Sequence, residues 1–171
     1  MSDFRLLAGL MVMCLGFATL QLSAQPISLH PENQHYFLYK NKPTVLITSG
    51  EHYGGTVALR QQLGYLKKFM DTFDFIKMKP DRSFLTGGLP ACARIHVLSE
   101  PGKQYAAYIR KGNQVNIKVT LPQGTYRVEW TDPVTGSSLK KGGFQHSGGE
   151  ASLSSPQYVY DISLKIINTK K

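Results

Sequence analysis

A short polar motif, Glu51-His52-Tyr53, brings together three side chains that can do chemistry. A carboxylate can transfer a proton, an imidazole can give or take one, and a phenol can hydrogen-bond a hydroxyl group. The motif follows the apolar run Thr44–Thr48 and precedes Gly54-Gly55. Polar loops at the carboxyl end of a buried strand are where α/β proteins place their ligands. The sequence therefore predicts Glu51, His52 and Tyr53 as substrate-binding residues.

Hydrolysis by paired carboxylates would need a second acid facing Glu51, at about 5–5.5 Å or 6.5–9.5 Å. Beyond residue 24 the chain holds ten carboxylates, and no two of them lie in neighbouring strand-end motifs. Asp81 and Asp132 lie beside prolines in predicted turns, and Glu129 and Asp161 lie on predicted solvent faces. We therefore expect structural or solvated roles for these four residues, and we assign no catalytic residue.

The histidines do not follow a metal-site pattern. They are His30, His35, His52, His96 and His146. Three of them have one potential partner three or four residues away, in predicted loops or strands where that spacing does not align two side chains. No segment gathers the ligands of a zinc site, and no glycine loop is arranged to cradle a phosphate. The lysine pairs are scattered rather than gathered into a stripe. We expect no metal, no cofactor and no nucleic-acid partner.

The first 24 residues have the layout of a secretory signal peptide. Arg5 precedes fifteen uncharged residues, Leu6–Leu20, and Ala24 offers a small residue for cleavage. The apolar run is shorter than the about 20 residues that span a membrane. We expect a secreted or periplasmic protein that begins near Gln25, with no membrane span after cleavage. Cys92 would then be its one cysteine, so no intramolecular disulfide could form, and we expect a buried, unreactive thiol.

The elements that must position these residues show three kinds of periodicity, the first two in the amino-terminal part. Residues 36–48 predict a β-hairpin around the turn Lys40–Pro43, with Thr44–Thr48 buried on both faces. Residues 57–70 predict one amphipathic helix, whose apolar stripe must pack against another element. The stripe consists of Leu59, Leu63, Leu66 and Met70.

From residue 93 onwards, apolar and polar residues alternate with a period of two. Turn signals separate five such runs, a pattern typical of an antiparallel sandwich or barrel. The predicted shared core contains Tyr126, Val128, Trp130, Tyr160, Ile162 and Leu164. Residues 74–79 are a candidate sixth strand, and residues 142–150 are predicted as a long loop or irregular hairpin. The predicted fold class is therefore mainly β: a C-terminal antiparallel β-sandwich preceded by a β-hairpin and one amphipathic helix.

Tyr108 is the binding-surface candidate of the predicted sandwich. It lies opposite the inward row of Tyr105, Ala107 and Ile109, so its ring faces outward. An exposed ring can contact a sugar or a peptide, although it can equally be an ordinary sheet-surface tyrosine. Residues 58–171 carry 17 basic and 8 acidic side chains, a net charge of +9 that favours an acidic polymer as partner.

Two separated pieces of the chain resemble one family. Residues 27–54 resemble the amino-terminal start of secreted bacterial glycoside hydrolases of the cellulase-like barrel type, which implies that Ser49–Tyr53 lie at the catalytic end of the first barrel strand. Residues 59–167 are similar to the last barrel helix of these enzymes and to the β-sandwich that follows it, known as a collagen-binding domain. The best-matching motif is Leu121-Pro122-x-Gly124-x-Tyr126-x-x-x-Trp130-x-Asp132-Pro133-x-Thr135-Gly136.

The resemblance implies that the middle of a barrel is missing from this chain. Gly54-Gly55 leads almost directly into the helix at Val57, where the resemblance implies most of a (β/α)8 barrel. The acid/base and nucleophile carboxylates of this enzyme type belong to that middle part, so neither can be carried over. The chain thus resembles an internally deleted relative, or two ends of a gene read as one.

The predicted organisation has four parts: a signal peptide (1–24), a hairpin with the first barrel strand (25–56), the last barrel helix (57–73) and a β-sandwich (74–171). Two functions follow. The first is a secreted, non-catalytic remnant whose sandwich binds a polysaccharide or a collagen-like polymer, or only supports a barrel. The second is a glycosidase, active in the intact family form, with Glu51-His52-Tyr53 at the pocket edge. We expect no glycoside hydrolysis by the chain as it stands.

Overall fold

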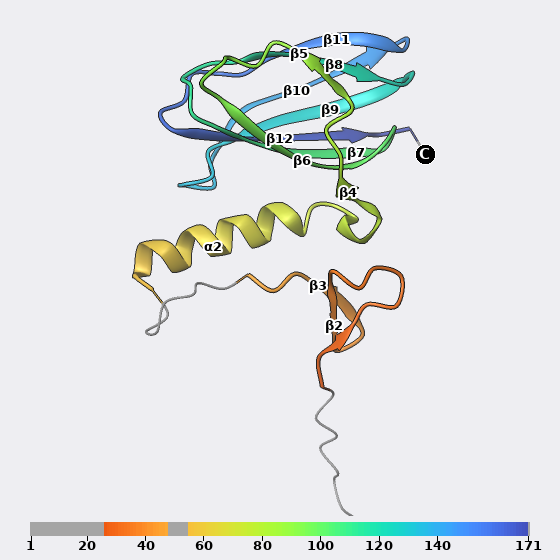
Figure 1. The fold of residues 1–171 in the computed structure, drawn as a ribbon, viewed down its shortest axis with the longest axis vertical. Helices are drawn as coiled ribbons and strands as arrows, with labels where there is room; N and C mark the ends of the chain where they lie inside the picture. Colours follow the sequence, from red (N-terminus) through yellow and green to blue (C-terminus); the bar gives the residue numbers. More distant parts are fainter. Residues whose placement is uncertain (1–25, 48–54, 171) are drawn as a thin grey trace, which may run out of the picture.

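The computed structural model describes residues 26–47 and 55–170, and its largest part is a sandwich of two antiparallel sheets (Figure 1). The larger sheet contains β4 (Lys79–Pro80), β6 (Arg94–Glu100), β7 (Gln104–Arg110), β9 (Gly124–Thr131), β10 (Ser138–His146) and β12 (Asp161–Asn168). Their order across the sheet is β10-β9-β12-β7-β6-β4. The smaller sheet contains β5 (Leu85–Gly87), β8 (Asn116–Leu121) and β11 (Gly149–Ser154), in the order β11-β8-β5. The predicted fold class is confirmed.

The two sheets face each other across one apolar core. Its fully buried members include Ile109, Ile117, Leu121, Ile162 and Leu164. Trp130 is 2% exposed, and Tyr126 is completely buried with its hydroxyl donating to the carbonyl of Pro122 at 2.9 Å. Arg127, on the opposite face of β9, is exposed. The predicted register of this strand is therefore confirmed.

β10 and β11 occupy the stretch where we predicted a long loop or irregular hairpin. Gly142 and Gly143 continue β10 opposite Val128 and Arg127 of β9. β11 pairs instead with β8, so the chain crosses here from one sheet to the other. Most of β10 is exposed, and a glycine-rich strand without a buried face carries little period-two signal. That is why the sequence pattern did not reveal it.

Three further predictions are wrong in detail. Tyr160 is 72% exposed rather than in the core, because β12 begins one residue later. Residues 74–79 form not a full strand but the short 3₁₀-helix η1 (Phe75–Lys77), followed by the two-residue β4. Cys92, expected to be buried, is exposed, because it lies in the turn before β6.

Residues 26–47 form a small sheet of β1 (Ser28–Leu29), β2 (Phe37–Tyr39) and β3 (Lys42–Thr44). The hairpin is confirmed, but its turn is Lys40-Asn41 alone, with φ values of 50° and 59° as in a two-residue hairpin turn. β3 lies at the edge of the sheet and ends at Thr44, and Leu46 is 54% exposed. The expectation of a strand buried on both faces is thus wrong for residues 44–47.

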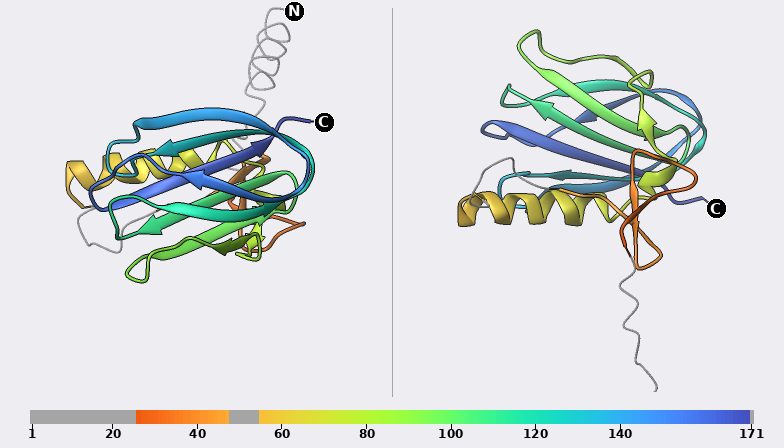
Figure 2. Two further views of the ribbon diagram at one scale, coloured as in Figure 1. Left: turned by 90° about the horizontal axis from the view of Figure 1, so that it is seen from above. Right: turned by 60° about the horizontal axis from the view of Figure 1, so that its bottom comes forward.

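α2 (Val57–Met70) is the one α-helix of the described residues, and it has the predicted bounds. The hydroxyl of Thr56 caps its first turn by accepting from the N–H of Leu59 at 3.2 Å. Lys67 and Asp71 pair at 3.0 Å at its carboxyl end. α2 runs along the larger sheet on the side away from the smaller sheet, as a third layer (Figures 1 and 2).

A second apolar cluster joins the end of α2, η1 and the larger sheet. Its buried members are Met70, Phe73, Phe75, Ile76, Met78 and Ala106. The ring of Tyr36 lies 4.9 Å from that of Phe75, centroid to centroid. The side-chain amide of Asn33 donates to the carbonyl of Ile76 at 2.9 Å. The amino-terminal sheet is therefore attached to the sandwich through this second cluster.

Candidate functional site

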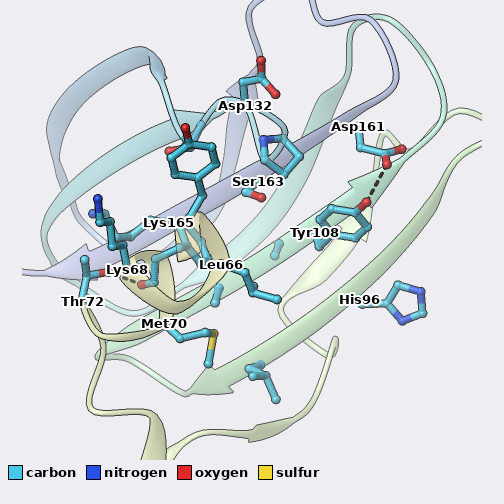
Figure 3. Close-up of a pocket in the computed structure, with 18 of the residues that line it drawn as sticks. Leu66, Lys68, Met70, Thr72, His96, Tyr108, Asp132, Asp161, Ser163 and Lys165 are labelled. Atoms are coloured by element: carbon cyan, nitrogen blue, oxygen red, sulfur yellow. Dashed lines mark hydrogen bonds between the residues drawn. The ribbon is translucent and has the colours of Figure 1, made fainter. Parts of the chain in front are cut away.

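A groove of about 1010 Å³ lies between α2 and the outer face of the larger sheet, the face turned away from the sandwich core (Figure 3). The predicted helix stripe lines it with Leu59, Leu63, Leu66 and Met70. Met70 is buried, whereas Leu66 is 47% exposed. The stripe packs against another element at its carboxyl end, as expected, and leaves room under the rest of the helix.

Strand register arranges the outer face in rows. In one row, His96 of β6 lies opposite Tyr108 of β7, which lies opposite Ser163 of β12. In the next row, Leu98 lies opposite Ala106. Ala106 is 6% exposed and belongs to the second apolar cluster, whereas His96 and Tyr108 are exposed. We call the row of His96, Tyr108 and Ser163 the polar end of the groove.

Tyr108 is held in place by an acidic neighbour (Figure 3). Its hydroxyl donates to Oδ2 of Asp161 at 2.5 Å, and Oδ1 of Asp161 accepts from the N–H of Lys111 at 3.2 Å. Burial, together with the hydrogen bond and the negative charge of Asp161, raises the pKa of Tyr108 to about 12. The phenol therefore stays protonated. Its ring is 38% exposed and fixed, which makes it a preorganised surface for a flat ligand.

Glu129, on the outer face of β9, is held ionised by two lysines. Nζ of Lys165 lies 2.7 Å from one of its oxygens, and Nζ of Lys141 lies 3.1 Å from the other. Burial raises the pKa of Glu129, but the hydrogen bonds from Lys165, Ser138 and Lys141 together with the charge of Lys165 outweigh it and lower the pKa to about 2. A carboxyl held in this state accepts hydrogen bonds but cannot serve as a general acid near neutral pH.

Two further carboxylates of the groove bond within their own turns. Asp81 accepts from the N–H and the hydroxyl of Ser83 at 2.8 and 2.9 Å, which lowers its pKa. Asp132 accepts from the N–H of Val134 at 2.8 Å and from the hydroxyl of Thr135 at 2.9 Å. Their predicted structural roles are confirmed.

The other two carboxylates, Glu129 and Asp161, also have structural roles, but the face on which they lie is not simply solvent-exposed as predicted. Both line the groove beneath α2 and bond to other residues of the larger sheet and its turns.

The predicted site residues are distributed unevenly over the structure. Tyr108 lies in the groove, with its ring outward as predicted. Glu51, His52 and Tyr53 lie outside the described residues, so their substrate-binding role stays a prediction. Within residues 26–47 and 55–170, no three His, Cys, Asp or Glu side chains form a group that could hold a metal ion. No helix in that part of the chain is long and apolar enough to cross a membrane.

His96 and Ser163 are groove residues that the sequence analysis did not single out. Both follow from the same alternation that pointed to Tyr108, since residues of one parity share one face of a sheet. Which residues of that face stay accessible depends on the position of α2, and no periodicity within the strands encodes it.

No protein-family model and no curated protein matches the chain. Among the solved structures that resemble it are two with 20% sequence identity. One, described as a glycoside hydrolase, aligns with 74% of this chain and 31% of its own length at a TM-score of 0.51. The other, a glycoside hydrolase family 5 protein from Bacteroides vulgatus, aligns with 66% of this chain and 25% of its own length at a TM-score of 0.52. The likeness shows a fold shared with part of these glycoside hydrolases, and the chain spans at most about a third of their length.

Proposed function

We propose that this chain is a non-catalytic accessory unit of glycoside-hydrolase type, exported through residues 1–24, whose β-sandwich binds a polysaccharide at the polar end of the groove. The observation that carries the proposal is Tyr108, an outward ring fixed by the 2.5 Å hydrogen bond to Asp161 beside the exposed His96. The glycoside hydrolases among the structural neighbours provide the enzyme context.

The polar end offers both kinds of contact that a sugar needs. The C–H face of a pyranose ring is apolar and can lie on the tyrosine ring, while its edge carries hydroxyl groups. His96, directly across from Tyr108 on β6, supplies an exposed hydrogen-bonding group beside that ring, and Ser163, across from Tyr108 on β12, lies at the floor of the groove with 7% of its surface exposed. Concave sites with an apolar floor and a few placed polar groups are the usual form of ligand sites.

Three of the described carboxylates are unsuited to act as the general acid of a glycosidase. The pKa of Asp81, Glu129 and Glu150 is lowered in each case, by hydrogen bonds from Ser83, from lysines, and from Thr86 and Lys118, respectively. A glycosidase needs one carboxyl whose pKa is raised so that it can protonate the leaving group. The pKa values of these three carboxyl groups are lowered instead.

A second candidate function is support for a barrel in a longer glycoside hydrolase, at the apolar part of the groove. It is favoured by the exposure of Leu66 on α2 and of Ile27, Leu29 and Leu46 in the amino-terminal sheet. The structural neighbours are three to four times longer than their aligned parts, so they contain much that this chain lacks. In such an intact form, Glu51-His52-Tyr53 would lie at the pocket edge of a glycosidase.

Retention of the purified full chain on insoluble polysaccharides and on insoluble collagen tests the first proposal. We expect the unchanged chain to be retained on a polysaccharide, and we expect Tyr108→Ala to bind it about tenfold more weakly. A tenfold loss corresponds to about 1.4 kcal/mol, which is the order of magnitude of one lost aromatic contact. Tyr39→Ala is the matched control, because Tyr39 is 47% exposed and lies on β2, outside the groove. Retention on collagen alone, or equal losses in both variants, would contradict polysaccharide binding at Tyr108.

A further inference from the structure

We propose that the rim beside the polar end, formed by Arg94, Arg110 and Lys111, binds the carboxylate groups of an acidic polysaccharide built from uronic acid residues. This inference rests on the proposed polysaccharide-binding function and narrows its substrate class. The observations that carry it are an unusual cross-strand pairing, the hydrogen bonds around it and an exposed tyrosine next to it.

Arg94 of β6 lies directly opposite Arg110 of β7 in the strand register, on the outer face of the larger sheet. Like charges directly opposite each other destabilise a sheet. The next strand offers one counter-charge, Asp161 of β12, which lies opposite Arg110. Its two oxygens, however, accept from the hydroxyl of Tyr108 and the N–H of Lys111, and Arg110 forms no ion pair with any described residue. The arginine pair therefore keeps its charge available.

The two arginines are also accessible. Both side chains are exposed. Nη1 of Arg94 donates to the carbonyls of Ala91 and Ala93 at 3.3 and 3.1 Å, which orients the guanidinium. Its Nη2 and Nε donors have no partner among the described residues. A planar guanidinium with free donors matches the geometry of a carboxylate, with which it forms two parallel hydrogen bonds.

A tight turn places Lys111 and an aromatic ring at the same rim. Lys111 and Gly112 both have positive φ, 67° and 91°, and a side chain at Gly112 would meet the Tyr158 hydroxyl, which donates to the carbonyl of Lys111 at 2.9 Å. The N–H of Lys111 donates to the carbonyl of Tyr160 at 3.0 Å. Arg110, Lys111 and Tyr160 line one shallow depression of about 490 Å³.

Tyr160 and its neighbour Val159 are 72% and 79% exposed, although they are large and apolar. A ring exposed beside an excess of positive charge suits a ligand with an apolar face and a negative edge, which is the chemistry of a uronic acid. With Asp161 included, the rim carries three positive charges and one negative. Tyr108 and Arg110 are two residues apart on β7, roughly 7 Å, so one oligosaccharide can reach both.

Binding of the purified full chain to polygalacturonate and to neutral galactan, at low and at 0.15 M salt, tests the inference. We expect tighter binding to polygalacturonate and a loss of about tenfold in Arg110→Gln for that polymer alone, since a charge-assisted hydrogen bond contributes about 1.5–3 kcal/mol. Arg110→Lys keeps the positive charge but lacks the planar guanidinium. Its affinity for polygalacturonate should lie between that of the unchanged chain and that of Arg110→Gln. Arg127→Gln, which removes the same charge from the outer face of β9, is the matched control and should change binding less than twofold.

The outcomes separate this inference from the function on which it rests. If galactan binds as well as polygalacturonate, and Arg110→Gln changes neither, the acidic substrate class is wrong while polysaccharide binding stands. If neither polymer nor any other polysaccharide is retained, both are wrong. If Arg110→Gln and Arg127→Gln weaken binding equally, or polyphosphate displaces polygalacturonate at equal charge, the rim is a general basic surface and the inference is overturned.

Discussion

The two faces of the larger sheet are built from the same strands and behave differently. Toward the smaller sheet, Trp130, Ile162 and Leu164 are at most 2% exposed. Toward α2, Ala106 is buried but Tyr108, two residues further along β7, is 38% exposed. The inner face packs against the second sheet in one continuous apolar core, and the outer face has an apolar cluster only where the end of α2 and η1 reach it. We infer that the inner face determines the fold and that the outer face is available for binding.

The largest expected effect separates the two faces by stability. Trp130→Ala should lower the free energy of unfolding by about 3–5 kcal/mol, because it removes the largest side chain from the inner core. Leu66→Ala, at an exposed position of the helix above the outer face, should lower it by less than about 1 kcal/mol. Urea unfolding measures both losses when it is followed by far-UV circular dichroism, a signal that remains usable after Trp130 is removed. Similar losses in the two variants would mean that α2 is as much a part of the core as the smaller sheet.

The next effect concerns acid stability of the outer face. The pKa of Glu129 is about 2 in the folded protein, below the 4.5 usual for a glutamate. A lowered pKa stabilises the fold above the unfolded-state pKa, and this contribution disappears as pH falls from about 5 toward 2. The full shift corresponds by linkage to about 3 kcal/mol, and solvent screening of the pair with the exposed Lys141 reduces the expected contribution to about 1–2 kcal/mol. Asp81 and Glu150, whose pKa values are also lowered, act in the same direction.

Unfolding by urea between pH 7 and pH 3 measures this contribution. Glu129→Gln should be less stable than the unchanged chain at pH 7 and should lose less stability on acidification, since it has no carboxyl to protonate. Parallel pH profiles for the two proteins would show that the pairs with Lys141 and Lys165 do not persist in solution.

A smaller effect compares two tyrosine hydroxyls, one on each face. Tyr126→Phe removes the buried bond to Pro122 and should cost about 1 kcal/mol of unfolding free energy. Tyr108→Phe removes the bond to the Asp161 carboxylate at an exposed site and should cost about half as much or less. The same urea experiment decides between them, and a larger loss in Tyr108→Phe would place the outer face within the cooperative core.

The smallest effect is at Cys92. Because the side chain is exposed in the turn before β6, a thiol reagent should modify it in the folded protein at a rate close to that of a free thiol. Cys92→Ser should change the unfolding free energy by less than about 0.5 kcal/mol and should abolish labelling of the chain cleaved after residue 24. Protection from the reagent until urea is added would restore the original expectation of a buried thiol.

The same contrast explains what the sequence could and could not predict. The inner face was predictable, because Tyr126 and Trp130 alternate with the exposed Arg127 and this period survives in the structure. The boundary at Tyr160 was not, since an apolar residue one position before β12 fits the same alternation. Cys92 lies two residues before β6, and its apolar side chain gives no sign that the strand starts only at Arg94. Periodicity predicts which side chains share a face, and says nothing of what lies over that face.

The candidate site shows this limit directly. Tyr108 could be predicted to point outward, but its bond to Asp161 joins strands 53 residues apart in the sequence. The alternating charge pattern predicted Glu129 to be solvated, although α2 lies across that face and two lysines pair with the carboxylate. Both relations depend on long-range strand pairing and on the position of the helix, which local spacing does not encode.

The division of roles between the two faces is tested most directly by one binding isotherm, that of Tyr108→Ala with a polysaccharide retained by the unchanged chain, recorded after its unfolding curve confirms that it is folded. We predict that the variant stays within about 1 kcal/mol of the original unfolding free energy and binds about tenfold more weakly. Unchanged affinity in the folded variant would contradict a binding role for the outer face. A variant that no longer folds would contradict the claim that residues of the outer face can change without disturbing the core.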